Sequence, residues 1–187
     1  MDNRIEIPIE FASDSDGKHF IYCKICNCDL QSSNTPYTIE KAYKRIDEAR
    51  DITLFEIAIC MDCAEKQSKT MSEESRQFIQ SLIGNSTFLE KRQNLWNNNW
   101  KHNWNERCLF SNKKIQLNDE YHIIGQFQNG KVIPQASPFI LGQDLIEEMQ
   151  ENLSKETKEE MDRFGEEFLG PDPTLKELFP DYQVIFV

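Results

Sequence analysis

The sequence predicts an α+β fold, and three observations support this prediction. The segments Tyr37–Arg45 and Ile52–Ile59 are rich in β-branched and aromatic residues, which is typical of strands. The dipeptide Asn129–Gly130 separates two further strand-like segments, and Asn-Gly is the strongest short signal for a β-hairpin. Between residues 144 and 169, apolar residues recur at helical spacing, which predicts an amphipathic helix near the C-terminal end.

The elements of the first half follow from local signals. Residues 1–18 predict a short strand or arm followed by a polar loop. Met61–Lys69 is polar and compatible with a helix, whereas residues 41–50 are compatible with a strand or a helix. Ser72 is a typical N-cap because acidic residues follow it, and Gly84 is a typical residue for the end of that helix.

Residues 86–107 predict a further helix with a stripe of tryptophans. Trp96, Trp100 and Trp104 are four residues apart, so they drift by only about 40° per step around a helix. The asparagines between them are modest helix formers, so propensity and periodicity disagree here. We favour a buried stripe and retain the three tryptophans as an alternative interaction surface.

The C-terminal helix is expected to bury one face and to end at residues 170–173, which contain glycine and prolines. Ser154 or Thr157 could begin a second helical piece. Tyr182–Val187 is expected to form a terminal strand. The residues expected on the buried side are Leu145, Met149, Leu153, Met161, Phe164 and Phe168.

The length of 187 residues fits one domain or two small ones. We divide the chain into an N-terminal zinc-binding unit, residues 1–85, and a second unit, residues 86–187, which could pack together as one domain. Aromatic residues make up 11% of the chain, which is too many for a disordered protein.

The charge is acidic and uneven. The net charge of -11 disfavours a global attraction to nucleic acid or to an anionic membrane. Residues 144–187 hold 13 acidic and 4 basic side chains, whereas residues 88–114 hold 6 basic and 2 acidic ones. A local basic surface is therefore compatible with the acidic total.

The first residues contain no basic segment followed by an apolar one, so we expect no secretory signal. No apolar run approaches the roughly 20 residues that a membrane span needs. We therefore expect a cytoplasmic protein, in which cysteines stay reduced and paired C-x-x-C motifs are more often metal ligands than disulfides.

Six cysteines are the most informative residues. Cys23 with Cys26, and Cys60 with Cys63, form two C-x-x-C pairs that predict one structural Zn²⁺ per chain, held by four thiolates. Cys28 is an alternative ligand in place of Cys26, or a neighbour that packs beside the site. Such a closed site leaves no coordination position for catalysis.

This arrangement resembles the treble-clef type of zinc finger, a zinc-ribbon-like module in which a first knuckle precedes a β-hairpin and a second knuckle opens a helix. The resemblance covers about residues 19–84 and is one of architecture. It implies that Cys23 and Cys26 form the first knuckle and that Cys60 and Cys63 stand at the start of a helix. It implies a structural zinc and indicates little about activity.

Three alternatives remain for the cysteines. Unmetallated cysteines behave as small buried hydrophobes. A redox C-x-x-C pair needs a βαβ context that the sequence does not show. An iron–sulfur cluster also uses four cysteines, but the spacing does not match the ferredoxin patterns.

A second, metal-free copy of the unit is a further hypothesis. The residues from Cys23 to Leu30 and those from Cys108 to Ile115 both read C-x-x-[C/S]-N-x-x-[L/I]. A Tyr-x-Ile triplet follows each stretch by a similar distance. Residues 108–150 would then be a degenerate copy, and coincidence is the alternative.

The most favoured function is a non-enzymatic protein-interaction or adaptor protein that carries a structural zinc and binds a protein partner through its acidic face or its tryptophans. The alternative is a nucleic-acid-binding zinc module that uses residues 88–114, where stacking and basic side chains coincide. A redox or metal-dependent enzyme is the third hypothesis. The sequence contains no catalytic motif that would name a reaction or a catalytic residue.

Overall fold

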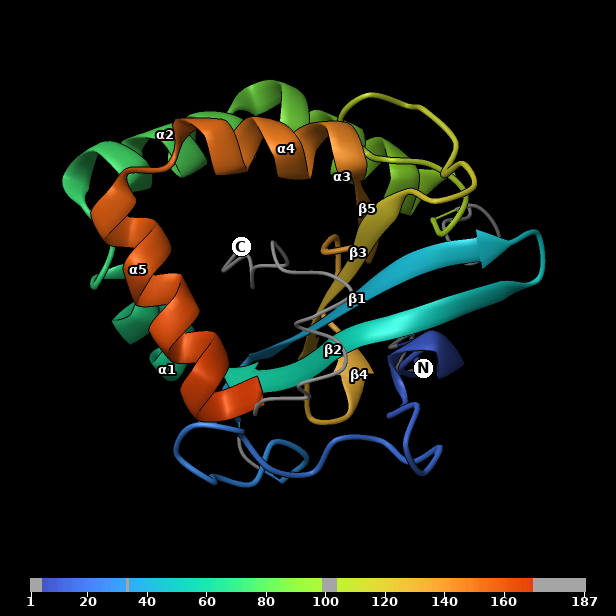
Figure 1. Ribbon diagram of the computed structural model, residues 1–187. Coiled ribbons are helices and arrows are strands. Elements are labelled where there is room, and N and C mark those ends of the chain that lie inside the picture. The colour runs from blue at the N-terminus through green and yellow to red at the C-terminus, as the bar shows by residue number, and fades with distance from the viewer. Residues whose placement is uncertain (1–4, 33, 99–103, 170–187) are drawn as a thin grey trace.

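The computed structural model describes residues 5–32, 34–98 and 104–169, which form a mixed α and β fold around an antiparallel sheet (Figure 1). The strands are β1 (Tyr37–Asp47), β2 (Arg50–Cys60), β3 (Glu120–Gln128), β4 (Lys131–Val132) and β5 (Phe139–Gly142). The helices are α1 (Met61–Ser68), α2 (Glu73–Ile83), α3 (Ser86–Asn97), α4 (Gln143–Asn152) and α5 (Lys155–Phe164). None of the helices in these residues is long and apolar enough to cross a membrane.

The sheet joins the two halves of the chain. Its order is β2-β1-β3-β4, and β5 pairs with the other part of β3. β1 and β3 are antiparallel, with Tyr37 opposite Phe127, Glu40 opposite Ile124, and Tyr43 opposite Tyr121. The two predicted units therefore share one sheet.

The predicted strands and the predicted hairpin are confirmed. β1 and β2 contain Tyr37–Arg45 and Ile52–Ile59, so residues 41–47 belong to a strand and the helical alternative was wrong there. Asn129 and Gly130 have φ of 51° and 70° and connect β3 to β4, as a tight hairpin requires. The N-terminal arm contains a 3₁₀ turn, η1 (Ile9–Phe11), rather than a strand.

The helix predicted over residues 86–107 is shorter than expected. α3 ends at Asn97, and its C-cap Asn98 leaves the helical region at φ -99° and ψ 41°. Trp104 lies beyond the helix and is buried at 2% exposure, stacked on Phe11 at a centroid separation of 5.3 Å. Burial of this side chain corrects the proposal that it forms part of a contact surface.

The helix predicted after residue 144 is divided into two pieces. α4 ends at Asn152, and Ser154 is the N-cap of α5. Ser154 is one of the two residues at which a second helical piece was expected to begin. A short π-helical segment, η3 (Gly165–Leu169), follows. Figure 1 shows α2, α3 and α4 together on one side of the molecule, with α5 running from there towards α1. The helix end predicted at residues 170–173 and the strand Tyr182–Val187 lie outside the described residues.

Candidate metal centre

The first C-x-x-C pair lies on a tight turn that precedes β1. The Cys23 N–H donates to the carbonyl of Cys28, and the Asn27 N–H donates to the carbonyl of Cys23, both at 2.9 Å. Asn27 adopts a positive φ of 58°, which Asn tolerates better than most residues. This turn brings the sulfurs of Cys23, Cys26 and Cys28 to one side.

The second pair comes from the end of β2. Cys60 is the last residue of β2 and the N-cap of α1, and Cys63 lies in the first turn of that helix. The Lys24 N–H donates to the carbonyl of Ala58 at 2.9 Å, so the end of β2 is fixed against the knuckle. The hairpin thereby returns Cys60 to the sulfurs of the first pair.

Four sulfurs lie close enough to hold a metal ion. The Sγ atoms of Cys23, Cys26, Cys28 and Cys60 are all within 4.8 Å of one another. Those of Cys26 and Cys60 are 3.7 Å apart, and tetrahedral zinc with Zn–S near 2.3 Å has sulfur–sulfur edges of about 3.8 Å. Cys63 is buried and interacts with the thiols of Cys26 and Cys60. The structure therefore places Cys28, rather than Cys63, in the group of four.

Hydrogen bonds favour the thiolate form at some of the cysteines, and burial opposes it at others. The backbone N–H of Cys28 bonds the sulfur of Cys26 and lowers the pKa of Cys26 to about 6. The Cys60 N–H donates to the Sγ of Cys23 at 3.4 Å. Burial raises the pKa of Cys28 to about 12 and also raises the pKa values of Cys60 and Cys63. A bound cation stabilises several clustered thiolates at once, which their mutual repulsion otherwise opposes.

Cys108 lies on a second turn with the same backbone geometry. The Cys108 N–H donates to the carbonyl of Lys113, and the Asn112 N–H donates to the carbonyl of Cys108, both at 2.9 Å. Asn112 has a φ of 58°, equal to that of Asn27. The Leu109 N–H donates to β5 at 2.9 Å, as Lys24 does to β2. Residues 107–152 thus follow the path of knuckle, strands and helix that the first unit follows.

The second turn lacks the clustered sulfurs of the first. Ser111 occupies the place of Cys26, and Gly142 takes the N-cap place in α4 that Cys60 takes in α1. A Cβ atom built on Gly142 would lie 3.1 Å from the Cβ of Cys108, so the two backbones approach closely. An ion pair of 3.2 Å between Lys113 and Asp144 also joins the turn to α4.

Most of the described basic side chains of residues 88–114 are engaged within the molecule. Three donate hydrogen bonds to backbone carbonyls and one pairs with a carboxylate. These side chains are Lys91, Arg92, Arg107 and Lys113. The guanidinium of Arg92 lies 4.9 Å from the ring centroid of Phe139, and burial lowers the pKa of Arg92 to about 10. Trp96 is half-buried against the core, and Trp100 lies outside the described residues.

Comparisons with family models, curated proteins and solved structures gave no match for this chain. The functional argument therefore rests on the geometry of the cysteine cluster and on the surfaces around it.

Proposed function

We propose that this chain is a non-enzymatic protein-interaction protein whose first unit is stabilised by one structural Zn²⁺. The observation that carries the metal proposal is the convergence of sulfurs from the knuckle and the N-terminus of α1. Cys23, Cys26 and Cys60 would supply three ligands. The C-x-x-C spacing favours Cys63 as the fourth, and the distances between the sulfurs favour Cys28 as the alternative. An all-thiolate set fits zinc, and such a closed shell gives folding energy rather than catalysis.

The same observations support a treble-clef-like architecture for both units. In the first, knuckle, hairpin and helix follow one another from Tyr22 to Ser68. In the second, the matching hydrogen bonds and the equal φ values at Asn27 and Asn112 favour a degenerate copy over coincidence. The copy would be held by packing and by the Lys113–Asp144 pair in place of a metal.

Metal analysis tests the first part of this proposal. Purified protein is expected to contain about one zinc per chain. Cys60→Ser should lower the free energy of unfolding by more than about 2 kcal/mol because the metal is lost. Cys108→Ser, at an equally buried cysteine of the second turn, should cost only about 1 kcal/mol and retain the zinc. A metal-free wild-type protein that remains folded would contradict the site, and equal losses in both variants would contradict the different roles.

The interaction part of the proposal rests on the outer face of α4. Leu145, Ile146 and Met149 are buried on its inner face, whereas the exposed residues include Glu147, Glu148 and Glu151, and the helix contains no basic residue. A face of one charge sign attracts a basic partner and raises the association rate. The partner class that this face fits is a protein with a basic surface.

A nucleic-acid-binding role is the second candidate, because residues 88–114 carry an excess of basic side chains. Two observations lower its rank. Trp104 is buried and cannot stack on a base, and four of the basic groups already bind atoms of the protein.

A capture experiment separates the two candidates. The bait is the full chain, compared with a variant that carries Glu147→Gln, Glu148→Gln and Glu151→Gln. The control removes three exposed charges elsewhere, through Glu48→Gln, Glu74→Gln and Glu90→Gln. A basic protein retained stoichiometrically by wild type and control, lost with the α4 variant and resistant to nuclease, is the expected result. Captured material that nuclease releases would favour the nucleic-acid role instead.

A further inference from the structure

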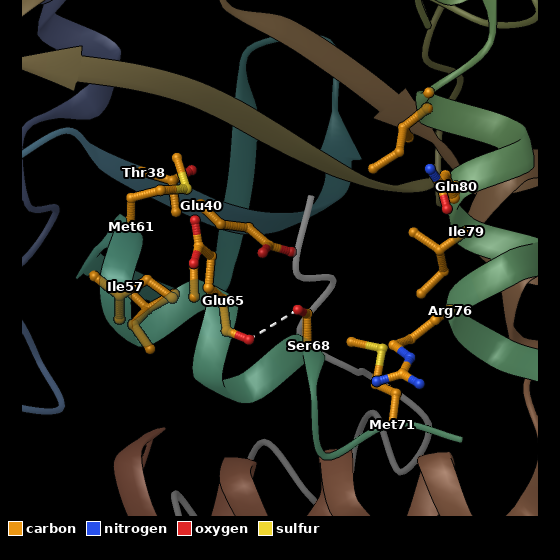
Figure 2. Close-up of a pocket in the computed structure, with 14 residues that line it drawn as sticks. Thr38, Glu40, Ile57, Met61, Glu65, Ser68, Met71, Arg76, Ile79 and Gln80 are labelled. Atoms are coloured by element: carbon orange, nitrogen blue, oxygen red, sulfur yellow. Dashed lines mark hydrogen bonds between the residues drawn. The ribbon is translucent and has the colours of Figure 1, made fainter. Parts of the chain in front are cut away.

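A pocket of about 430 Å³ opens between α1, α2 and the face of the sheet formed by β1 and β2. Pockets that bind small molecules have such volumes, are mostly apolar and contain a few polar groups that orient the ligand. Figure 2 shows Glu40 and Met61 on the side of the sheet and α1, with Arg76 and Ile79 on the facing wall. The apolar part of the described lining consists of Ile57, Ile59, Met61, Ala64, Met71, Ile79 and Ile83.

Glu40 is the most buried polar residue of the described lining, at 4% exposure. Its carboxylate lies 2.7 Å from the Nδ1 of His122, which is buried at 1% exposure. A neutral imidazole donates its Nδ1–H to the carboxylate and leaves the negative charge in place. Because a buried charge is costly, a carboxylate at this place favours a ligand that brings an opposite charge.

The second unit holds an apolar residue where the first has Glu40. Glu40 of β1 lies opposite Ile57 of β2. The corresponding pair of the second unit is Ile124 of β3 opposite Phe139 of β5, and both of these residues are 1% exposed. The same architecture therefore packs with an apolar side chain at this place, so packing does not require the carboxylate of the first unit.

The first unit also has a smaller side chain than the second at a place that borders the pocket. Ala64 and Ile146 are the fourth residues of α1 and α4. Ile146 is buried in a cluster with Phe139 and Leu141, whereas Ala64 lines the pocket. Relative to the second unit, the first unit thus gains both volume and a negative charge in one pocket.

The other charges of the described lining also favour a cationic ligand. Glu65 adds a second carboxylate. Arg76 is the cation of this lining, and it is paired with Glu73, which lies outside the pocket. Because Glu73 balances the charge of Arg76, the two carboxylates leave the described lining negative.

We propose that this pocket binds a small organic cation. The apolar body of the ligand would lie between Ile57, Ala64 and Ile79, and its ammonium would donate a hydrogen bond to the carboxylate of Glu40. A hydrogen bond between two charged groups is shorter and stronger than one between neutral groups. The inference goes beyond the proposed interaction role, because it uses neither the metal nor the acidic face of α4.

Titration of the full chain with phenethylamine tests this inference, with phenethyl alcohol as the matched neutral compound. The two compounds share one carbon skeleton, and the amine carries an ammonium at neutral pH where the alcohol has a hydroxyl. We expect a Kd of about 1 mM or lower for the amine and at least about tenfold weaker binding of the alcohol. Isothermal titration calorimetry measures both affinities. A Kd of the amine above about 10 mM, or equal affinities of the two compounds, overturns the proposal.

Two variants locate the bound amine, and the second keeps the test decisive if the first does not fold. Glu40→Gln keeps the size of the side chain and removes its charge, so the affinity for the amine should fall at least about tenfold. Glu48→Gln, at an exposed glutamate, is its control and should leave the affinity unchanged. Ala64→Ile fills the pocket with the side chain that Ile146 has in the second unit and should remove binding of both compounds. Gln67→Ile places the same side chain on α1 outside the described lining and should leave both affinities unchanged. Unchanged binding of the amine in a folded Glu40→Gln or Ala64→Ile variant overturns the proposal, because the amine would then bind elsewhere.

Discussion

Lys41 shows how one residue can join a loop to the sheet. Its side chain has 0% exposure, and its ammonium donates to the carbonyl of Ala12 at 2.6 Å and to Asp14 at 2.7 Å. Glu56 lies 3.3 Å away as a second anion. A buried ammonium is costly unless it is paired and hydrogen-bonded, and here three oxygens meet that need. The N-terminal loop is therefore held by a charge that the strand supplies.

Asp14 predicts a pH dependence of stability. Burial opposes its charged form, but hydrogen bonds from Lys41, Thr53 and Tyr43 outweigh that effect and lower the pKa of Asp14 below its ordinary value of 3.8. A group with a lowered folded pKa stabilises the fold above its unfolded pKa, and this contribution is lost as the pH falls through the folded value. Wild type should therefore lose stability more steeply than Asp14→Asn between about pH 5 and about pH 2.

Denaturant unfolding at a series of pH values measures this difference. Loss of the proposed metal from its thiolates would be common to both proteins, so the difference in slope isolates Asp14. Equal slopes would show that the contacts of Asp14 do not contribute to stability.

The fourth metal ligand is a second question at the scale of residues. Cys63 is buried in the first turn of α1, whereas Cys28 lies in the knuckle and is half-buried. We expect Cys63→Ser to lower zinc affinity by at least about tenfold. Mutation of a residue that only supports a metal ligand already lowers metal affinity by about tenfold or more, and loss of a ligand should lower it at least as much. Cys28→Ser should retain about one zinc per chain with nearly unchanged affinity. Titration with a competing chelator measures both, and the reverse order would assign the place to Cys28.

The spacing of the cysteines predicted three members of this cluster, Cys23, Cys26 and Cys60, because each C-x-x-C motif is local. It favoured Cys63 as the fourth, whereas the four mutually close sulfurs include Cys28, since the packing of the hairpin decides which of the two lies nearer. The contacts of Lys41 were also beyond prediction, because Asp14 is 27 positions away and Glu56 is on another strand.

At the scale of elements, the N-termini of α2 and α5 stabilise each other. Ser72 and Ser154 are the N-caps, and their hydroxyls are 2.9 Å apart. The Ser72 N–H donates to the hydroxyl of Thr157 at 3.0 Å, and the Ser154 N–H donates to that of Ser75 at 2.9 Å. Ser75 and Thr157 are fully buried, so each helix satisfies backbone groups of the other.

This reciprocal network predicts coupled losses of stability. Ser75→Ala and Thr157→Val should each lower the free energy of unfolding by about 1–2 kcal/mol, because each leaves a buried N–H without its partner. The double variant should lose less than the sum, because the two hydroxyls belong to one network. Ser81→Ala, at an exposed hydroxyl of α2, is the control and should change stability by less than about 0.5 kcal/mol. Strict additivity in denaturant unfolding would contradict a shared network.

Local sequence signals predicted the helix N-caps and the hairpin turn, because the residues that give each signal also make the contacts that form it. Ser72, Ser154 and Asn129–Gly130 act through their own neighbours in the chain, and each has the predicted place. The end of α3 was missed because periodicity suggested a longer helix than the asparagines support. The favoured burial of the tryptophan stripe holds for Trp104, but Phe11, on which it stacks, is far away in the sequence, so no local pattern could identify that partner.

At the scale of the whole molecule, the two units meet with an approximate twofold relation. Tyr37 pairs with Phe127, and Tyr43 pairs with Tyr121. Tyr37 of β1 corresponds to Tyr121 of β3, and Tyr43 of β1 corresponds to Phe127 of β3, each 84 positions later. Exchanging corresponding residues therefore turns the first pair into the second. The sequence suggested the repeat through Cys108 and the following Tyr-x-Ile, but it could not show that β1 and β3 would pair. That pairing places the unit that carries the cluster of sulfurs beside the one that carries Cys108.

This relation predicts that a metal site can be built in the second unit to match the one proposed for the first. Replacing Ser111, Gly142 and Leu145 by cysteine adds three thiols to Cys108 at the places that correspond to Cys26, Cys60 and Cys63. A Cβ atom at position 142 would lie 3.5 Å from the Sγ of Cys108. A cysteine at this position would therefore place its thiol beside that of Cys108. The triple variant should bind about two zinc ions per chain, and the same variant with Cys108→Ser should bind the second ion at least about tenfold more weakly. Elemental analysis and chelator titration measure both quantities. A folded triple variant that still binds one zinc would show that the second turn is not equivalent to the first.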